Sequence, residues 1–254
     1  MKDLRLVAAD RNRAARNAPP EPGAEKKDLV LLVADRNQEA AVKALLGRHR
    51  SLGIRPVAYD LHVHPRRDPG CFREAHEFLR PLRDGYDHAL VLFDAAWEGA
   101  PLQVPTGLEQ TGRTTATEGT DEEPPRDPTG LEEAVRGRFR EVGIEKWADV
   151  VVIVPELEVW VWSDSPHVDQ ALGWAGRAPG LRRWLAEQNL WPEGMRKPPD
   201  PMQALERALW QTRVPRESRV YAKLARTVSV KRCEDASFAR LRRLLVSWFP
   251  EGRS

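Results

Sequence analysis

Apolar runs alternate with stretches of helical spacing along much of this chain, and this alternation limits its possible folds more than any other feature. DLVLLVAD (28–35) has the composition of a buried strand, and QEAAVKALLGRHRSLG (38–53) has apolar residues at helical spacing and a glycine at its end. Strands that alternate with helices of this length form a parallel sheet with right-handed crossovers. The same pattern predicts further strands at 54–63, 87–94 and 149–154, and further helices at 71–85 and 131–143.

Three segments lie outside this alternation. Residues 1–27 include APPEPGAEKK and lack apolar periodicity, which indicates a flexible leader. Residues 95–130 are acidic and rich in Gly, Thr and Pro, and a loop of this length in a compact domain is usually functional or disordered. We therefore expect the leader, an α/β domain (28–165) that includes the long loop, and an Arg- and Trp-rich helical extension (166–254). Helices of the extension are expected at 180–189, 201–210, 218–227 and 235–249.

Composition excludes several classes of protein. Of the 254 residues, 41% are hydrophobic and 31% are charged, which is typical of a globular protein. No apolar run approaches the roughly 20 residues that a membrane span needs, and the first residues lack the apolar stretch of a signal peptide. Two cysteines cannot form a disulfide framework or a four-cysteine zinc site. We expect a cytoplasmic protein that does not contact a membrane.

Acidic residues follow three of the four predicted strands. Asp35 and Asp94 close the first and third strands, and Glu156 and Glu158 follow the fourth in VVIVPELEVWVWSD (151–164). Because the ends of parallel strands share one edge of the sheet, we expect these acids to gather there. Crowded carboxylates repel each other unless they are protonated or bound to a cation, and Mg²⁺ typically takes one or two of them plus phosphate oxygens.

A site for Mg²⁺ or Mn²⁺ is therefore expected at this edge. Asp35, Asp94 and Glu158 are the candidate catalytic residues. The alternative is that strand-end aspartates cap the next helix, and Asp35, which precedes Arg-Asn-Gln-Glu, has the position of an N-cap. The sequence leaves both interpretations open. The candidate metal ligands are Asp35, Asp94, Glu98, Glu156 and Glu158.

The order of these elements resembles a Toprim-type fold. In both, a strand with an acid, a helix, a strand, a helix and a second strand with an acid follow one another. Asp35 stands at the position of the family's strand-end glutamate, with Glu39 in the following helix. LFDAAWEG (92–99) stands at the family's Asp-x-Asp, with Asp94 as the first aspartate. The resemblance implies a Toprim-like fold and a carboxylate site for a divalent metal ion.

The chain departs from the Toprim pattern near both acids. Ala96 replaces the second aspartate, and Arg36 replaces the glycine that follows the family's glutamate. Glu98 is the candidate substitute for the missing aspartate.

Within this superfamily, the chain is most similar to an uncharacterised Toprim-like group found in bacterial anti-phage defence loci. That group includes a component of methylation-associated defence systems. The similarity covers roughly residues 28–248 and lies in HPRRDPGCFREAHEFLRPL, HALVLFD, PELEVWVWSD and SRVYAKLARTVSVKRCEDASFARLRRLL. It implies a role in phage defence beside other defence proteins, and it supplies no molecular activity.

The segment YDLHVHP (59–65) offers a different metal chemistry. Alternation along a strand places Asp60, His62 and His64 on one face, and His-x-His is a usable metal pair. Taken alone, the segment resembles the opening of metal-dependent amidohydrolase barrels, which need several more histidines. A complete strand and helix precede it here, so we expect a surface strand end whose histidines form hydrogen bonds. A histidine-dependent metallo-hydrolase is the least favoured hypothesis.

Basic residues and tryptophans concentrate in the second half of the chain. From Arg177 onward there are 17 Lys and Arg against eight acids, whereas residues 98–133 contain nine acids and two arginines. Arginine suits phosphate contacts and exposed tryptophans stack on bases, so DNA or RNA is expected to bind this half if it binds at all. Most tryptophans fall at apolar helix positions and are expected in the core. Trp160 and Trp162 continue the alternation of the fourth strand.

Two functions follow from these patterns. The first is a divalent-metal phosphodiester nuclease within a defence system, which the convergence of acids favours. The second is a catalytically inactive Toprim-like scaffold or nucleic-acid-binding subunit of a defence complex, which Ala96 favours.

Overall fold

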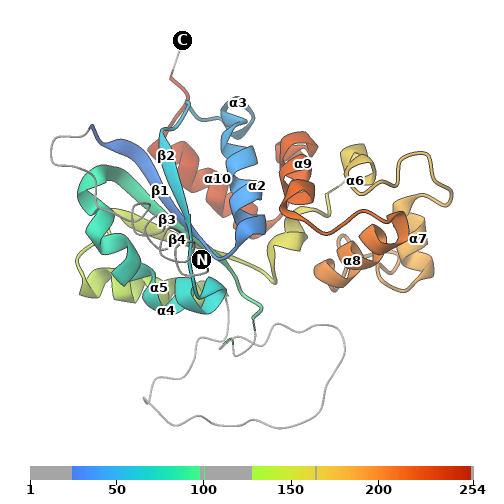
Figure 1. The fold of residues 1–254 in the computed structure, drawn as a ribbon, viewed down its shortest axis with the longest axis horizontal. Coiled ribbons are helices and arrows are strands. Elements are labelled where there is room, and N and C mark those ends of the chain that lie inside the picture. Colours follow the sequence, from blue (N-terminus) through green and yellow to red (C-terminus); the bar gives the residue numbers. More distant parts are fainter. Residues whose placement is uncertain (1–24, 98–99, 101–127, 164, 253–254) are drawn as a thin grey trace, which may run out of the picture.

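A sheet of four parallel strands forms the centre of the molecule (Figure 1). The computed structural model describes residues 25–97, 100, 128–163 and 165–252. The strand order is β2-β1-β3-β4, so the predicted α/β architecture with a parallel sheet flanked by helices is confirmed. The strands are β1 (Lys27–Val33), β2 (Tyr59–Val63), β3 (Tyr86–Asp94) and β4 (Ala148–Ile153).

Helices cover both faces of this sheet (Figure 1). Successive side chains of a strand point to opposite faces, so Leu29 and Leu31 face α2, whereas Val30 and Leu32 face α4 and α5. All four side chains are fully buried, which explains why β1 is apolar throughout. The elements between the strands are α2 (Arg36–Leu46), α3 (His49–Leu52), α4 (Arg67–Leu79), the 3-10 helix η1 (Arg80–Gly85) and α5 (Pro128–Glu141).

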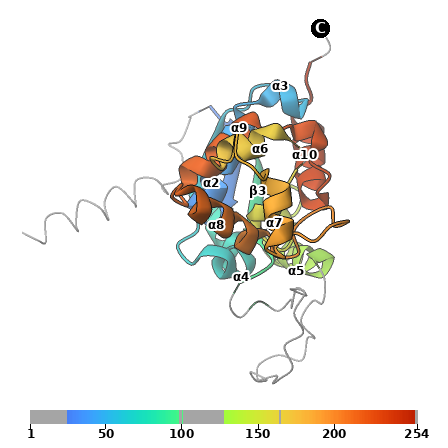
Figure 2. The same ribbon diagram turned by 90° about the vertical axis from the view of Figure 1, so that its right-hand side faces the viewer.

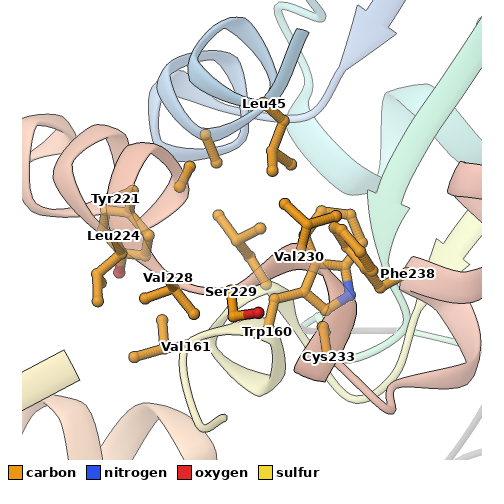
Figure 3. A pocket seen from close by; sticks show the side chains of 13 residues that line it. Leu45, Trp160, Val161, Tyr221, Leu224, Val228, Ser229, Val230, Cys233 and Phe238 are labelled. Atoms are coloured by element: carbon orange, nitrogen blue, oxygen red, sulfur yellow. The ribbon is translucent and has the colours of Figure 1, made fainter. Parts of the chain in front are cut away.

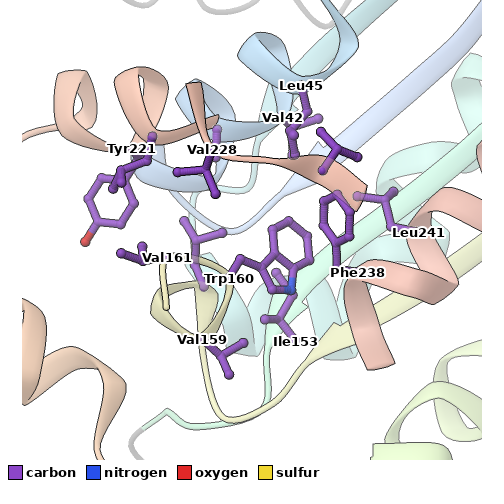
Figure 4. Close-up of a cluster of buried hydrophobic side chains, with 14 of the residues drawn as sticks. Val42, Leu45, Ile153, Val159, Trp160, Val161, Tyr221, Val228, Phe238 and Leu241 are labelled. Atoms are coloured by element: carbon purple, nitrogen blue, oxygen red, sulfur yellow. The ribbon is translucent and has the colours of Figure 1, made fainter. Parts of the chain in front are cut away.

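The helices that follow β4 share the core of the sheet. Trp160 packs against Phe238 with ring centroids 5.3 Å apart (Figure 4). Its Nε1 donates a 2.8 Å hydrogen bond to Ser237 Oγ. This contact joins the segment after β4 to α10, and α9 packs along α2. Figure 2 shows α6, α7, α8 and α9 grouped at one side of the molecule. The elements are η2 (Leu157–Trp160), α6 (Pro166–Ala171), α7 (Leu181–Glu187), α8 (Pro201–Thr212), α9 (Ser218–Thr227), η3 (Val230–Arg232) and α10 (Ala236–Trp248).

The predicted elements are present with shifted ends. The helix expected at 71–85 begins earlier, at Arg67, and its last part is the 3-10 helix η1, because Pro81 lacks the N–H that an α-helix needs. The helix expected at 38–53 is divided into α2 and α3. Among the helices that the structure describes, none combines the length and the apolar character that crossing a membrane requires.

The alternation predicted to continue past β4 is wrong. The strand ends at Ile153, and η2 follows, so Trp160 and Trp162 do not extend a strand. Both are buried in the core instead. The leader expected at 1–27 lies outside the described residues up to residue 24, as does most of the expected loop (98–99 and 101–127).

Candidate carboxylate site at the end of the sheet

Asp94 lies where the strand order of the sheet reverses. The chain passes from β1 to β2 on one side and from β3 to β4 on the other, and ligands of open α/β sheets bind at the carboxyl ends of such strands. Gln38 Nε2 donates a 2.8 Å hydrogen bond to Asp94 Oδ1. The Oε1 atom of the same side chain accepts a 2.9 Å hydrogen bond from the backbone N–H of Ala34, just after β1. Gln38 therefore ties the two strand ends together.

Asp35 caps α2. Its Oδ1 accepts hydrogen bonds from the backbone N–H groups of Asn37 and Gln38, at 2.8 and 2.9 Å. The capping interpretation is therefore confirmed. Both bonds use the same oxygen, and Asp35 remains close enough to Asp68 and Asp94 to raise the pKa of both carboxyls. The cap and a role at the sheet edge are thus compatible.

Asp68 is a third member of this site and was not among the predicted residues. Pro69 and Gly70 are residues typical of a turn, but residues 67–70 form the first turn of α4. Asp68 Oδ1 accepts a 2.8 Å hydrogen bond from the backbone N–H of Asp94. A helix that follows a parallel strand begins at the carboxyl edge of the sheet, so an acid in its first turn is a signal that could have been used. We call Asp35, Asp68 and Asp94 the aspartate cluster.

Burial and mutual repulsion favour protonated carboxyls in this cluster. Burial raises the pKa of Asp94 well above its usual value, and the charges of Asp68, Glu158 and Asp35 raise it further. Burial also raises the pKa of Asp68 to about 6, against the opposing effect of its hydrogen bond with the Asp94 backbone. A cation placed among these groups would reverse the effect, because it favours the charged carboxylates.

Glu158 has cationic and hydroxyl partners from the C-terminal helices. Arg216 Nη2 donates a 2.9 Å hydrogen bond to Glu158 Oε1, and the Tyr221 hydroxyl donates to the same oxygen. Only 2% of Glu158 is exposed. Its charge reaches Asp94, whose pKa it raises, but its carboxylate is bound by α9 and the segment before it. Glu158 therefore anchors the helices as well as lying near the cluster.

Glu156 faces the start of α8. Its Oε1 accepts a 3.0 Å hydrogen bond from the backbone N–H of Met202 in the first turn of that helix. Burial raises the pKa of Glu156 to about 8, and the nearby Glu158 and Asp200 contribute. Glu98, the remaining predicted ligand, lies outside the described residues.

Two arginines lie beside the aspartate cluster. Arg67 begins α4 with a φ of 51°, its side chain is exposed, and its charge lowers the pKa of Asp68. Within the described part of the chain, no hydrogen bond or ion pair engages the Arg67 side chain. Arg36 begins α2, and its side chain is 74% exposed with one contact of 3.1 Å to Glu39. Helix N-termini favour anions, so this edge combines acids with groups that suit phosphate.

The carboxylates do not form a ready ligand set. Over the residues that the structure describes, no three His, Cys, Asp or Glu side chains are grouped so that they could hold a metal ion. The carboxylates are therefore close enough to affect one another's pKa, but no three of them are placed to bind one ion.

The histidines of β2 take structural positions. Both rings pack against Phe78 of α4, at 5.6 Å for His62 and 5.8 Å for His64. Asp60 binds Lys27 Nζ at 2.7 Å and accepts a hydrogen bond from the Tyr86 hydroxyl. His64 is 5% exposed, so the expectation of a surface strand end is wrong for this residue, because α4 covers it.

A separate apolar pocket lies between α2, η2, α9 and α10 (Figure 3). Trp160, Leu224, Val230 and Phe238 are among its lining residues, and Cys233 faces it with a thiol pKa that burial raises. The sulfur is therefore a poor nucleophile at neutral pH. The pocket carries no pair of groups suited to acid-base chemistry.

No family model, curated protein or solved structure matches this chain. Function is therefore argued from the geometry. The carboxyl edge of the sheet holds three aspartates that affect one another's pKa, two helix N-termini and two arginines.

Proposed function

We propose that the aspartate cluster binds Mg²⁺ or Mn²⁺ and that the chain is a Toprim-like phosphodiester nuclease of a phage-defence system. The observation that carries the proposal is the position of Asp94, a half-buried acid without an ion-pair partner among the described residues, at the reversal of the strand order. The four-stranded parallel sheet is consistent with a Toprim-like layout. The role in defence rests on the sequence resemblance alone.

The donor set of the cluster suits a hard divalent cation. Mg²⁺ prefers oxygen ligands, keeps several waters, and usually takes one or two carboxylates plus substrate phosphate oxygens. A site of this kind can use fewer than three protein ligands, and no three-ligand group occurs among the described residues. Asp94 and Asp68 would hold the ion, with Asp35 beside them. A bound cation supplies charge to a phosphoryl group and lowers the pKa of a coordinated water.

The remaining groups of this edge have distinct tasks in the proposal. Arg67 is free to contact a phosphate, and Arg36 can leave its exposed contact with Glu39 at little cost. Gln38 donates to Asp94 and so orients its carboxyl group. These residues bind and position the substrate backbone without reading base sequence.

DNA cleavage tests the proposed activity. Labelled single-stranded and duplex DNA are incubated with Mg²⁺ or Mn²⁺ and wild-type protein, Asp94→Asn or Asp87→Asn. Asp87 is the matched control, because it is exposed and lies at the opposite end of β3. We expect wild type and Asp87→Asn to cleave and Asp94→Asn to lose cleavage. Equal cleavage by both variants, or none by wild type, would contradict the nuclease proposal.

A catalytically inactive binding subunit is the second candidate. Ala96 stands where the Toprim pattern has an aspartate, and Glu158 is already neutralised by Arg216. Such a protein would bind partner proteins or nucleic acid and would cleave neither single-stranded nor duplex DNA. The cleavage assay therefore separates the two candidates.

A further inference from the structure

Trp210 departs from the pattern of the other tryptophans. It has 73% of its surface exposed on α8, whereas Trp160, Trp162 and Trp174 are at most 9% exposed. The expectation that tryptophans at apolar helix positions lie in the core is therefore wrong for Trp210. Leu205 and Leu209 provide the buried face of α8, so the indole is not needed for packing there. The exposed indole is therefore available to stack on a ligand.

One arginine lies over the exposed indole, and two others lie near the C-terminal end of α8. The Arg207 guanidinium lies 5.9 Å from the centre of the Trp210 ring. Arg213 is the C-cap residue of α8, and Arg177 Nη1 donates to the carbonyl oxygen of Gln211 at 3.5 Å. Among the residues that the structure describes, none of these arginines forms an ion pair with a carboxylate. Together, Arg177, Arg207, Trp210 and Arg213 are here called the Trp210 surface.

We propose that the Trp210 surface binds single-stranded nucleic acid. Stacking of a base on the indole buries the exposed aromatic face. The Arg207 guanidinium beside the ring, with Arg177 and Arg213 near the end of the same helix, matches the charge of adjacent phosphates. The acid nearest in the helix, Glu206, does not oppose this, because Arg216 Nη1 binds it at 2.9 Å. A duplex fits less well, since its bases are already stacked on one another.

A protein partner fits this surface less well. Protein interfaces bury a contiguous apolar centre ringed by polar residues. The side chains around Trp210 on the exposed face of α8 are Gln203, Glu206 and Arg207, all polar. Apart from Trp210, Met195 is the one large apolar side chain that the described residues leave exposed. A single indole among cations suits a planar, negatively charged polymer.

This inference deepens the proposed function. Binding of the strand does not depend on nuclease activity, whereas cleavage of the bound strand rests on the proposed function. Helix α8 begins beside Glu156 at the carboxyl edge of the sheet, where Met202 N donates to that carboxylate. Trp210 lies eight residues further, about 12 Å along the helix axis. On this proposal, a bound strand runs from Trp210 along α8 toward the edge of the sheet.

Binding is measured by fluorescence anisotropy with a labelled oligothymidylate and the full chain in EDTA and 50 mM salt. Without a divalent cation, cleavage plays no part, so a failure here is distinct from a failure of the nuclease proposal. We expect Trp210→Ala to weaken binding about tenfold and Trp210→Phe to retain most of the wild-type affinity. The double variant Arg207→Glu, Arg213→Glu should abolish binding. Arg183→Glu is the control, because Arg183 is 79% exposed on α7 and pairs with Glu187.

Circular dichroism checks that each variant is folded. Because Trp210 is exposed, we expect its replacement to leave the fold intact. Binding by Trp210→Ala equal to that of wild type would overturn the inference, as would absence of binding by wild type. Equal loss in Arg183→Glu would also overturn it, because charge alone would then explain binding. Polyglutamate is added as a competitor. If it displaces the oligonucleotide and its own binding is lost in Trp210→Ala, the surface binds an acidic protein instead, and the inference is wrong.

Discussion

At the scale of single residues, the buried Glu158 and the half-buried Asp94 lie near the same sheet edge in different electrostatic environments. Glu158 accepts hydrogen bonds from the Arg216 guanidinium and the Tyr221 hydroxyl, so its charge is compensated within the chain. Asp94 receives a side-chain hydrogen bond only from the neutral amide of Gln38, as far as the described residues show. Burial without a cation favours the protonated acid. Asp94 is therefore the residue whose state depends most on an added cation.

The pKa of Glu156 predicts a pH dependence of stability. Because the folded pKa is raised to about 8 from a usual value of 4.5, the folded protein holds a proton that the unfolded chain releases. The stabilisation is complete below pH 4.5 and is lost as the pH rises through 8. Glu156→Gln mimics the protonated acid, so we expect its Tm advantage over wild type to grow between pH 5 and pH 8.5. A difference in Tm that stays constant over this range would show that Glu156 is not buried as described.

Gly70 predicts a steric effect on α4. A Cβ atom there would lie 2.0 Å from His64 Nδ1, which is held under the helix. We expect Gly70→Ala to lower the free energy of unfolding by about 1–3 kcal/mol. Gly137→Ala on α5 is the control, because its Cβ would meet only the end of Arg140 at 3.8 Å. That change should be neutral or stabilising by up to about 1 kcal/mol. Urea denaturation measures both, and similar values for the two variants would refute the close approach.

At the scale of elements, the end of β4 shows what the sequence pattern could and could not predict. The apolar run and its closing acids placed Glu156 and Glu158 at the carboxyl edge of the sheet. The partners of Glu158 could not be predicted, because Arg216 and Tyr221 lie 58 and 63 residues further along the chain. Asp68 could not be predicted for a local reason, because Pro69 and Gly70 are typical of a turn although α4 begins there.

Arg216 predicts how firmly the C-terminal helices are held. Its Nε, Nη1 and Nη2 atoms bind Tyr221, Glu206 and Glu158, so its loss leaves the buried Glu158 without a cation. We expect Arg216→Ala to destabilise by about 2–3 kcal/mol, below the cost for a fully buried pair because Arg216 is one third exposed. Arg219→Ala, which removes an 85% exposed arginine, should cost less than about 0.5 kcal/mol. Equal Tm values for the two variants would contradict the anchoring role of Glu158.

At the scale of the whole molecule, periodicity predicted the sheet because β1, β3 and β4 contain runs of residues that are apolar on both faces. It predicted the C-terminal helices too, but not that α9 and α10 complete the core on the α2 face. That packing depends on contacts such as Trp160 with Phe238, which no local pattern encodes. In the resulting arrangement, the aspartate cluster lies at the carboxyl edge of the sheet, and the Trp210 surface lies near the C-terminal end of α8.

The central claim is that the aspartate cluster binds a divalent cation, and electron paramagnetic resonance of Mn²⁺ tests it most directly. The signal of free Mn²⁺ falls as the ion binds, so a titration at pH 8 gives the number of sites and their affinity. We predict one site in wild type and in Asp87→Asn, and loss of that site in Asp94→Asn. Binding should weaken at pH 5, where the Asp68 carboxyl, with a pKa of about 6, is protonated. Undiminished Mn²⁺ binding by Asp94→Asn, or no binding by wild type, would contradict the account.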